Sequence, residues 1–90
     1  MPPHPTLEQL RQRIDRVDAR ILRLLNRRAG LAMRVGRLKQ RDGLRLFDPK
    51  REAAILRHLI QTNIGPLSAA AVRAIYREIL RQVRRVERSA

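Results

Sequence analysis

The amino-acid sequence predicts an all-α fold with three helices per chain, the first of them very long. Apolar residues recur at heptad spacing from Leu7 to Leu38, a period that is typical of packed helices. Capping residues, proline or glycine border this segment and two later apolar segments. We find no alternating strand pattern and no internal repeat, and 90 residues suit a single domain.

The first helix is expected over residues 7–41. Residues 1–6, three of which are proline, are expected to form a disordered N-terminal lead. Thr6 can act as the N-cap, because its hydroxyl can accept a hydrogen bond from the first turn. Asp42 and Gly43 would end the helix, since glycine is common just past a helix C-terminus.

One position of the heptad-spaced row, which we call the seam, is not apolar. The seam consists of Leu7, Leu10, Ile14, Val17, Ile21, Leu24, Arg28, Leu31, Val35 and Leu38. A guanidinium keeps its proton, and burying it unpaired is costly. Arg28 therefore either reaches water or lines an internal pocket for an anion. Gly30 and Gly36 are tolerated within the helix rather than favourable to it.

The second helix is expected over residues 49–63. Asp48 can cap its N-terminus, and Pro49 suits the first helical position. The helix would end before Gly65 and Pro66, a pair that favours a turn.

The third helix is expected over residues 68–88, with Ser68 as its cap. With the other two helices it completes one helical domain over residues 7–88. It carries a long apolar stripe that comprises Val72, Ile75, Tyr76, Ile79, Leu80, Val83 and Val86.

The length of the first helix predicts an oligomer. At about 1.5 Å per residue the helix would be about 50 Å long. A compact chain of 90 residues has a diameter of only about 30 Å. Two shorter helices cannot cover the whole seam, so we expect an intertwined, two-fold helical homodimer.

The composition narrows the range of functions. The chain has 21 basic and 8 acidic residues, a net charge of +13, and 19 of the basic residues are arginine. This balance favours anionic partners, although an arginine-rich proteome would also produce it. The absence of cysteine excludes disulfides and zinc–thiolate sites. Because we find neither a signal peptide nor a membrane span, we expect a soluble, cytoplasmic protein without a membrane partner.

Four basic residues could form an anion site. Arg28 and Lys39 lie 11 positions apart, which places them about 20° apart around the helix and about 16 Å apart along it. Arg11 lies about 100° from Arg28 and 17 positions earlier, so it could reach the pocket of a partner more easily than its own. Arg51 would add a cation near the N-terminus of the second helix, a place that favours anions.

Each candidate also has a purely structural interpretation. Arg11 could pair with Asp15, and Lys39 could complement the dipole of the first helix. Asp48 could be only a helix cap, and Glu52 could pair with an arginine of the second helix. Arg28 is different, because its place in the seam argues against a solvated role.

Several motifs resemble those of the all-helical (AroQ-type) chorismate mutases. They are LRQRID from Leu10, RR followed by small residues from Arg27, VGRLK from Val35, DPKRE from Asp48, and IYREIL in the third helix. The resemblance runs from about Leu7 to nearly the end of the chain. It implies three helices per chain and an intertwined homodimer with two active sites. It also implies rearrangement of chorismate to prephenate, on the route to phenylalanine and tyrosine.

The resemblance also implies roles for individual residues. Arg11 from the opposite subunit and Arg28 from the same subunit would each bind a substrate carboxylate. Lys39 would contact the ether oxygen of the breaking bond and a carboxylate. Arg51 would be a further arginine of the pocket. Asp48 and Glu52 would meet the ring hydroxyl. Glu87 would donate a hydrogen bond to the ether oxygen. The chain departs from the family at Val83, where many members have a serine near a carboxylate.

A pericyclic reaction needs no nucleophile, metal or redox cofactor, and we expect none. Catalysis would come from holding the flexible dianion in its reactive shape and stabilising charge on the ether oxygen. If Glu87 donates to that oxygen it must be protonated, so activity should fall as pH rises.

Three alternative functions remain open at this point. An isochorismate-pyruvate lyase would use the same scaffold, although the VGRLK and DPKRE segments resemble the mutases more. A basic helical dimer that binds nucleic acid fits the charge, but Phe47 and Tyr76 are the only aromatic residues available for stacking. A regulatory module could keep the fold without efficient catalysis.

Overall fold

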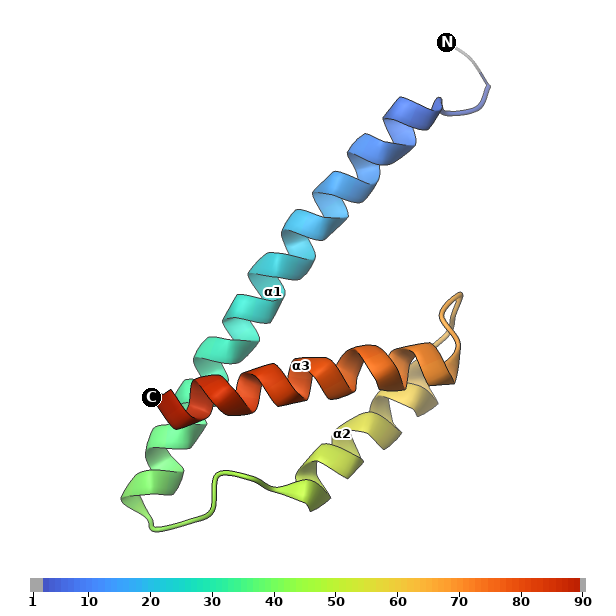
Figure 1. Cartoon of the computed structure of the whole chain (residues 1–90). Helices are drawn as coiled ribbons and strands as arrows, with labels where there is room; N and C mark the ends of the chain where they lie inside the picture. Colours follow the sequence, from blue (N-terminus) through green and yellow to red (C-terminus); the bar gives the residue numbers. More distant parts are fainter. Residues whose placement is uncertain (1–2, 90) are drawn as a thin grey trace.

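The computed structural model describes residues 3–89, and this part of the chain consists of three helices without a strand (Figure 1). The helices are α1 (Leu7–Arg41), α2 (Pro49–Thr62) and α3 (Ala69–Ser89). The predicted all-α fold is therefore confirmed. α1 has the expected bounds, α2 ends one residue earlier than expected, and α3 begins and ends one residue later. Residues 1 and 2 of the expected disordered lead lie outside the described residues.

Side-chain caps fix the starts of α1 and α3. The Thr6 hydroxyl accepts a hydrogen bond from the Gln9 backbone N–H at 3.1 Å, and the Gln9 side chain accepts one from the Thr6 backbone N–H at 2.9 Å. This reciprocal pair satisfies two donors that a helix start leaves free. The Ser68 hydroxyl accepts a hydrogen bond from the Ala71 N–H at 3.1 Å. After α1, Gly43 adopts a φ of 68°, a left-handed conformation that glycine reaches at little cost.

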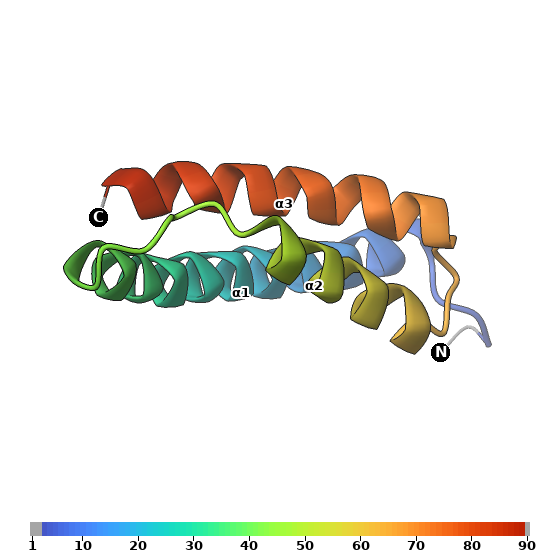
Figure 2. The same ribbon diagram turned by 90° about the horizontal axis from the view of Figure 1, so that it is seen from below.

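α3 is the central element of the subunit. α2 and α3 form an antiparallel hairpin, and α3 crosses the C-terminal half of α1 (Figures 1 and 2). α3 contacts both other helices. It also supplies the most deeply buried apolar side chains of the described residues, which are Val72, Leu80 and Val83. Because α3 packs against both α1 and α2, it connects these two helices.

Gly36 sets the closest approach between α1 and α3. It is the buried residue of α1, and a Cβ atom there would lie 3.0 Å from the Glu87 backbone oxygen and 3.4 Å from the Glu87 Cα. Few real Cβ contacts are as short as the first of these distances, so a side chain at this position would push the two helix backbones apart by a few tenths of an ångström. Gly36 thus has a packing role beyond its place in the helix, and the sequence alone does not reveal the second helix that packs on it.

We expect Gly36→Ala to lower the free energy of unfolding by about 1 kcal/mol. Overpacking costs about 1–3 kcal/mol, and the gain in helix propensity returns about 1 kcal/mol. Gly30→Ala is the matched control, because nothing lies within 4 Å of the Cβ it would add. That variant should be more stable by about 0.5–1 kcal/mol. Urea unfolding at one fixed protein concentration measures both changes, and equal stabilisation of the two variants would contradict the close approach.

The N-terminal half of α1 extends clear of α2 and α3 (Figure 1). Every residue from 3 to 24 is exposed, and the nine aliphatic residues of the seam have exposed fractions between 42% and 64%. The radius of gyration is 17.1 Å, compared with about 12 Å for a compact chain of this length. Such a long exposed apolar row is unusual for a monomer and marks an interaction surface.

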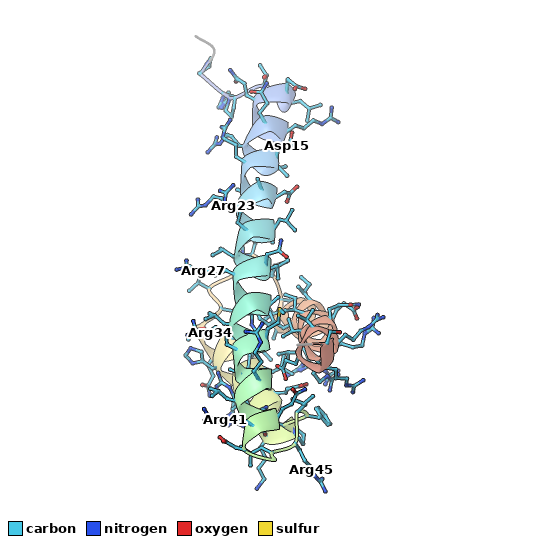
Figure 3. All side chains as sticks on the ribbon, turned by 90° about the vertical axis from the view of Figure 1, so that its left-hand side faces the viewer. Asp15, Arg23, Arg27, Arg34, Arg41 and Arg45 are labelled. Carbon is cyan, nitrogen blue, oxygen red and sulfur yellow. The ribbon has the colours of Figure 1, made fainter. Side chains whose placement is uncertain are left out.

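α1 has three different sides. Arg23, Arg27, Arg34 and Arg41 lie along the side that faces away from α3 (Figure 3). At 100° per residue the seam lies about a quarter turn from this arginine row, and the side with Gly36 lies opposite the row. α3 therefore packs beside the seam and leaves the seam itself uncovered. No described helix combines the length and the hydropathy that a membrane crossing requires.

Candidate active site

A cavity of about 270 Å³ lies where α1, the start of α2 and the C-terminal half of α3 meet. Leu31, Val35, Ile55, Leu80 and Val83 supply apolar walls. The charged residues that line the cavity are Arg28, Lys39, Asp48, Arg51, Glu52, Arg84 and Glu87. Six of the seven site residues predicted from the sequence therefore come together, and the seventh, Arg11, lies elsewhere.

Arg28 and Lys39 reach the cavity from α1, and both are partly buried. Arg28, although part of the seam, lines the cavity rather than projecting into bulk solvent. The Lys39 Nζ donates a hydrogen bond to the Leu46 backbone oxygen at 3.0 Å. The lysine ammonium is thus held against the segment between α1 and α2, which goes beyond a general interaction with the helix dipole.

The first turn of α2 contributes three more charged groups. Asp48 is the N-cap, and its Oδ1 accepts a hydrogen bond from the Arg51 backbone N–H at 3.0 Å. Its structural role and its place in the cavity are therefore compatible. Arg51 and Glu52 both line the cavity, and Arg51 is exposed while Glu52 is partly buried. Backbone N–H groups at this helix start add to the positive potential.

Glu52 pairs with an arginine of α3. Its Oε2 lies 3.5 Å from the Nη1 of Arg84, and the Arg84 guanidinium carbon lies 4.5 Å from the centroid of the Phe47 ring. The structural alternative, a pair between Glu52 and an arginine of the second helix, is not formed among the described residues, where the arginine within ion-pair distance of Glu52 belongs to α3. Arg84 thus connects α3 to the start of α2 and to the segment before it.

Glu87 is the carboxyl group best placed to carry a proton. Its Oε2 is buried without a hydrogen-bond partner. Burial raises the pKa of Glu87, and the negative charge of Glu52 raises it further. The positive charges of Lys39, Arg28 and Arg84 oppose this shift without cancelling it. A protonated carboxyl in this cavity can donate a hydrogen bond, which a carboxylate cannot do.

Arg11 is exposed in the half of α1 that extends away from the other helices. It does not line the cavity of its own subunit. Its structural alternative, a pair with Asp15, is not formed in the described part of the chain, where no ion pair involves Arg11.

Arg84 is the charged lining residue that sequence reasoning missed. A signal for it exists, because Leu80, Val83, Arg84 and Glu87 follow the i, i+3, i+4, i+7 spacing of one helix face. The adjacent Val83 is 8% exposed and lines the cavity. Its side chain offers no hydroxyl there, so the polar contact expected of a serine at this position is missing.

The arrangement suits a small molecule with two negative charges. Four cationic side chains surround the cavity, and arginine forks match carboxylates well. Lys39 and a protonated Glu87 provide two donors near each other, which could stabilise negative charge on one oxygen atom. The lining residues include no serine, cysteine or histidine that could serve as a nucleophile. The cationic lining suits the binding and electrostatic stabilisation of an anion.

Comparisons with known proteins agree with this interpretation. Residues 10–88 match the family described as chorismate mutase type II. The chain is 42% identical over 78 residues to the bifunctional chorismate mutase/prephenate dehydratase of Aquifex aeolicus, a match that covers 82% of this chain and 22% of that protein. The chain thus spans about a fifth of the length of the bifunctional relatives it matches.

Two solved structures are similar over nearly the whole chain. Chorismate mutase (form II) of Thermus thermophilus superposes with a TM-score of 0.90 at 38% identity, covering 91% of this chain and 93% of that one. Chorismate mutase of Helicobacter pylori in complex with prephenate gives a TM-score of 0.86 at 30% identity, covering 92% and 90%. On the strength of the match to residues 10–88, this chain belongs to the chorismate mutase type II family.

Proposed function

We propose that this protein catalyses the rearrangement of chorismate to prephenate. The observation that carries the proposal is the convergence of Arg28, Lys39, Arg51 and Glu87 on one cavity of metabolite size. Family membership supports it, and so does the likeness to a chorismate mutase in complex with prephenate. The cytoplasmic location expected from the sequence remains part of this proposal.

The proposed mechanism assigns separate tasks to the two kinds of cation. Arg28 and Arg51 hold the carboxylates of the dianion, which selects its compact reactive shape. Lys39 and protonated Glu87 donate hydrogen bonds to the ether oxygen, where negative charge grows as the C–O bond breaks. Asp48 and Glu52 orient the ring hydroxyl. The apolar walls keep water from weakening these interactions.

A homodimer that completes each site with Arg11 of the other chain forms the second part of the proposal. The exposed seam supports it, because a second copy of the seam would cover the row with matching apolar residues. Leu31 and Val35 of the seam also line the cavity. A partner lying on the seam would therefore close the open side of the cavity as well.

Mixing two inactive variants tests the contribution of Arg11 across the interface. Arg11→Ala and Arg28→Ala should each lower activity about a hundredfold or more. Co-expressed in equal amounts, they should recover about a quarter of the wild-type activity, because half of the dimers are mixed and each of these has one intact site. If Arg11 served its own subunit, mixed dimers would contain no intact site, and no activity would return.

The function itself is tested by supplying chorismate and isochorismate separately to the purified protein and identifying the products. We expect prephenate from chorismate and no pyruvate from isochorismate. Release of pyruvate would instead identify the lyase. Tight binding of duplex DNA at physiological salt without turnover of either compound would favour the nucleic-acid interpretation.

A further inference from the structure

Arg84 differs from the other arginines of α3. The helix carries six arginines between residues 69 and 89, and the other five are exposed. The Arg84 side chain is 28% exposed, and that of its partner Glu52 is 22% exposed. Specific contacts must hold a partly buried arginine in a cavity wall, because its guanidinium would otherwise extend into solvent.

The contacts of Arg84 reach two parts of the cavity at once. Its guanidinium carbon lies 4.5 Å from the centroid of the Phe47 ring, within the range of a cation–π interaction. Its Nη1 lies 3.5 Å from the Oε2 of Glu52. Phe47 immediately precedes the N-cap Asp48, so the arginine braces the segment that delivers Asp48 and Glu52 to the cavity.

The same segment is held from the other side by Lys39. The lysine Nζ bonds to the carbonyl oxygen of Leu46, the residue directly before Phe47. Residues 44–48 contain no regular secondary structure. Backbone hydrogen bonds tie Leu44 to α1 and Asp48 to α2 at the two ends of the segment, so side-chain contacts must hold the residues between them. Two cations from two different helices therefore hold two adjacent residues of one irregular segment.

Arg84 also balances the charge between two carboxyl groups of the cavity. Glu87 faces Lys39 and Arg28 from α1, Glu52 from α2 and Arg84 from its own helix. Arg84 pairs with Glu52 and lies one turn before Glu87, so it screens one acidic group from the other. Removing the guanidinium would leave two acidic groups facing each other with fewer cations between them.

We infer that Arg84 is a positioning residue, which holds Glu52 and the Phe47–Asp48 segment in place and sets the charge balance around Glu87. The inference rests on the proposed function, because Glu52 and Glu87 act there on the substrate. Arg84 itself contacts other protein groups, so its influence on the reaction passes through them.

The first test needs no turnover. Hydrogen–deuterium exchange of the amides of residues 44–48 should be about tenfold faster in Arg84→Ala, because a cation–π contact and an ion pair are lost. Arg85→Ala removes the same charge from an exposed neighbour, and its exchange should equal that of the wild type. Equal exchange in the two variants would overturn the bracing role, even in a protein that did not convert chorismate.

The second test uses the reaction. Arg84→Ala should lower kcat about tenfold with a smaller change in KM, since misplaced groups slow the chemical step more than binding. The loss of activity at alkaline pH should also move to higher pH, because removing a positive charge makes Glu87 harder to deprotonate. Arg84→Lys restores the positive charge, so the loss of activity at alkaline pH (the alkaline limb of the profile) should return to its wild-type position. Its kcat should recover only in part, because lysine does not reproduce the geometry of a guanidinium.

A purely structural role would give a different pattern. It would lower the amount of folded protein without moving the alkaline limb, and Arg84→Lys would then rescue stability and kcat together. If Arg84→Ala does not fold, Phe47→Leu keeps the ion pair and removes only the ring. That variant should speed exchange of residues 44–48 and leave the alkaline limb in place, and unchanged exchange would overturn the inference.

Discussion

Lys39→Ala is expected to lower kcat for chorismate by about two to three orders of magnitude. An effect of this size follows from removing one preorganised donor aimed at a developing negative charge, which costs about 3–4 kcal/mol of the barrier. The ammonium of Lys39 is preorganised, because its hydrogen bond to the Leu46 backbone oxygen holds it at the cavity wall. Binding of chorismate should weaken less, since the arginines still meet the carboxylates.

The chain offers a matched control for this substitution. Lys50 is the other lysine, and it is exposed in the first turn of α2. Lys50→Ala removes the same charge without touching the cavity, so its kcat should match the wild type. Steady-state kinetics on prephenate formation distinguishes the two variants. Similar kinetics for both would mean that Lys39 acts only through the overall positive charge.

The second large effect is a loss of activity at alkaline pH that depends on Glu87. Burial raises the pKa of Glu87, and the protonated form is the one that can donate to the ether oxygen. Activity should therefore be constant below this pKa. Above it, activity should fall about tenfold for each pH unit, as the proton is lost. The resulting carboxylate would also repel the dianionic substrate.

Glu87→Gln should remove this dependence, because an amide donates a hydrogen bond at every pH. Glu78→Gln on the same helix is the control. A side-chain hydrogen bond from Arg81 lowers the pKa of Glu78 to about 2, so Glu78 stays ionised over the whole assay range, and its variant should keep the wild-type profile. A rate profile of kcat from about pH 5 to about pH 10 is the measurement. A flat wild-type profile would exclude Glu87 as the donor.

The helices were predictable because their limits depend on neighbouring residues. Thr6 and Ser68 cap the helices they precede, and the glycine at position 43 follows α1 as expected. The unusual position of Arg28 was also apparent from the sequence. A permanently charged side chain within an aliphatic row must either reach water or line a pocket for an anion. Five of the six predicted residues that line the cavity lie on α1 or at the start of α2, whereas the sixth, Glu87, lies on α3 and was predicted from the family resemblance.

The contacts between helices were not predictable in this way. The partner of Glu52 and the close approach at Gly36 depend on where α3 lies. The hydrogen bond of Lys39 to a loop carbonyl depends on the path of the segment between α1 and α2. Periodicity defines which face of a helix is apolar, but it leaves the depth and angle of a crossing undetermined. Arg84 was overlooked because an arginine next to an apolar stripe is usually solvated.

The uncovered row on α1 has a genetic consequence under the proposed dimer. A two-fold axis presents every residue of that row twice, so one codon change alters the interface at two places. Substitutions there would have twice the effect on assembly that a single contact suggests. By the same symmetry, a stabilising substitution would also act at two positions. Single substitutions in this row would therefore change the stability of the dimer strongly in either direction.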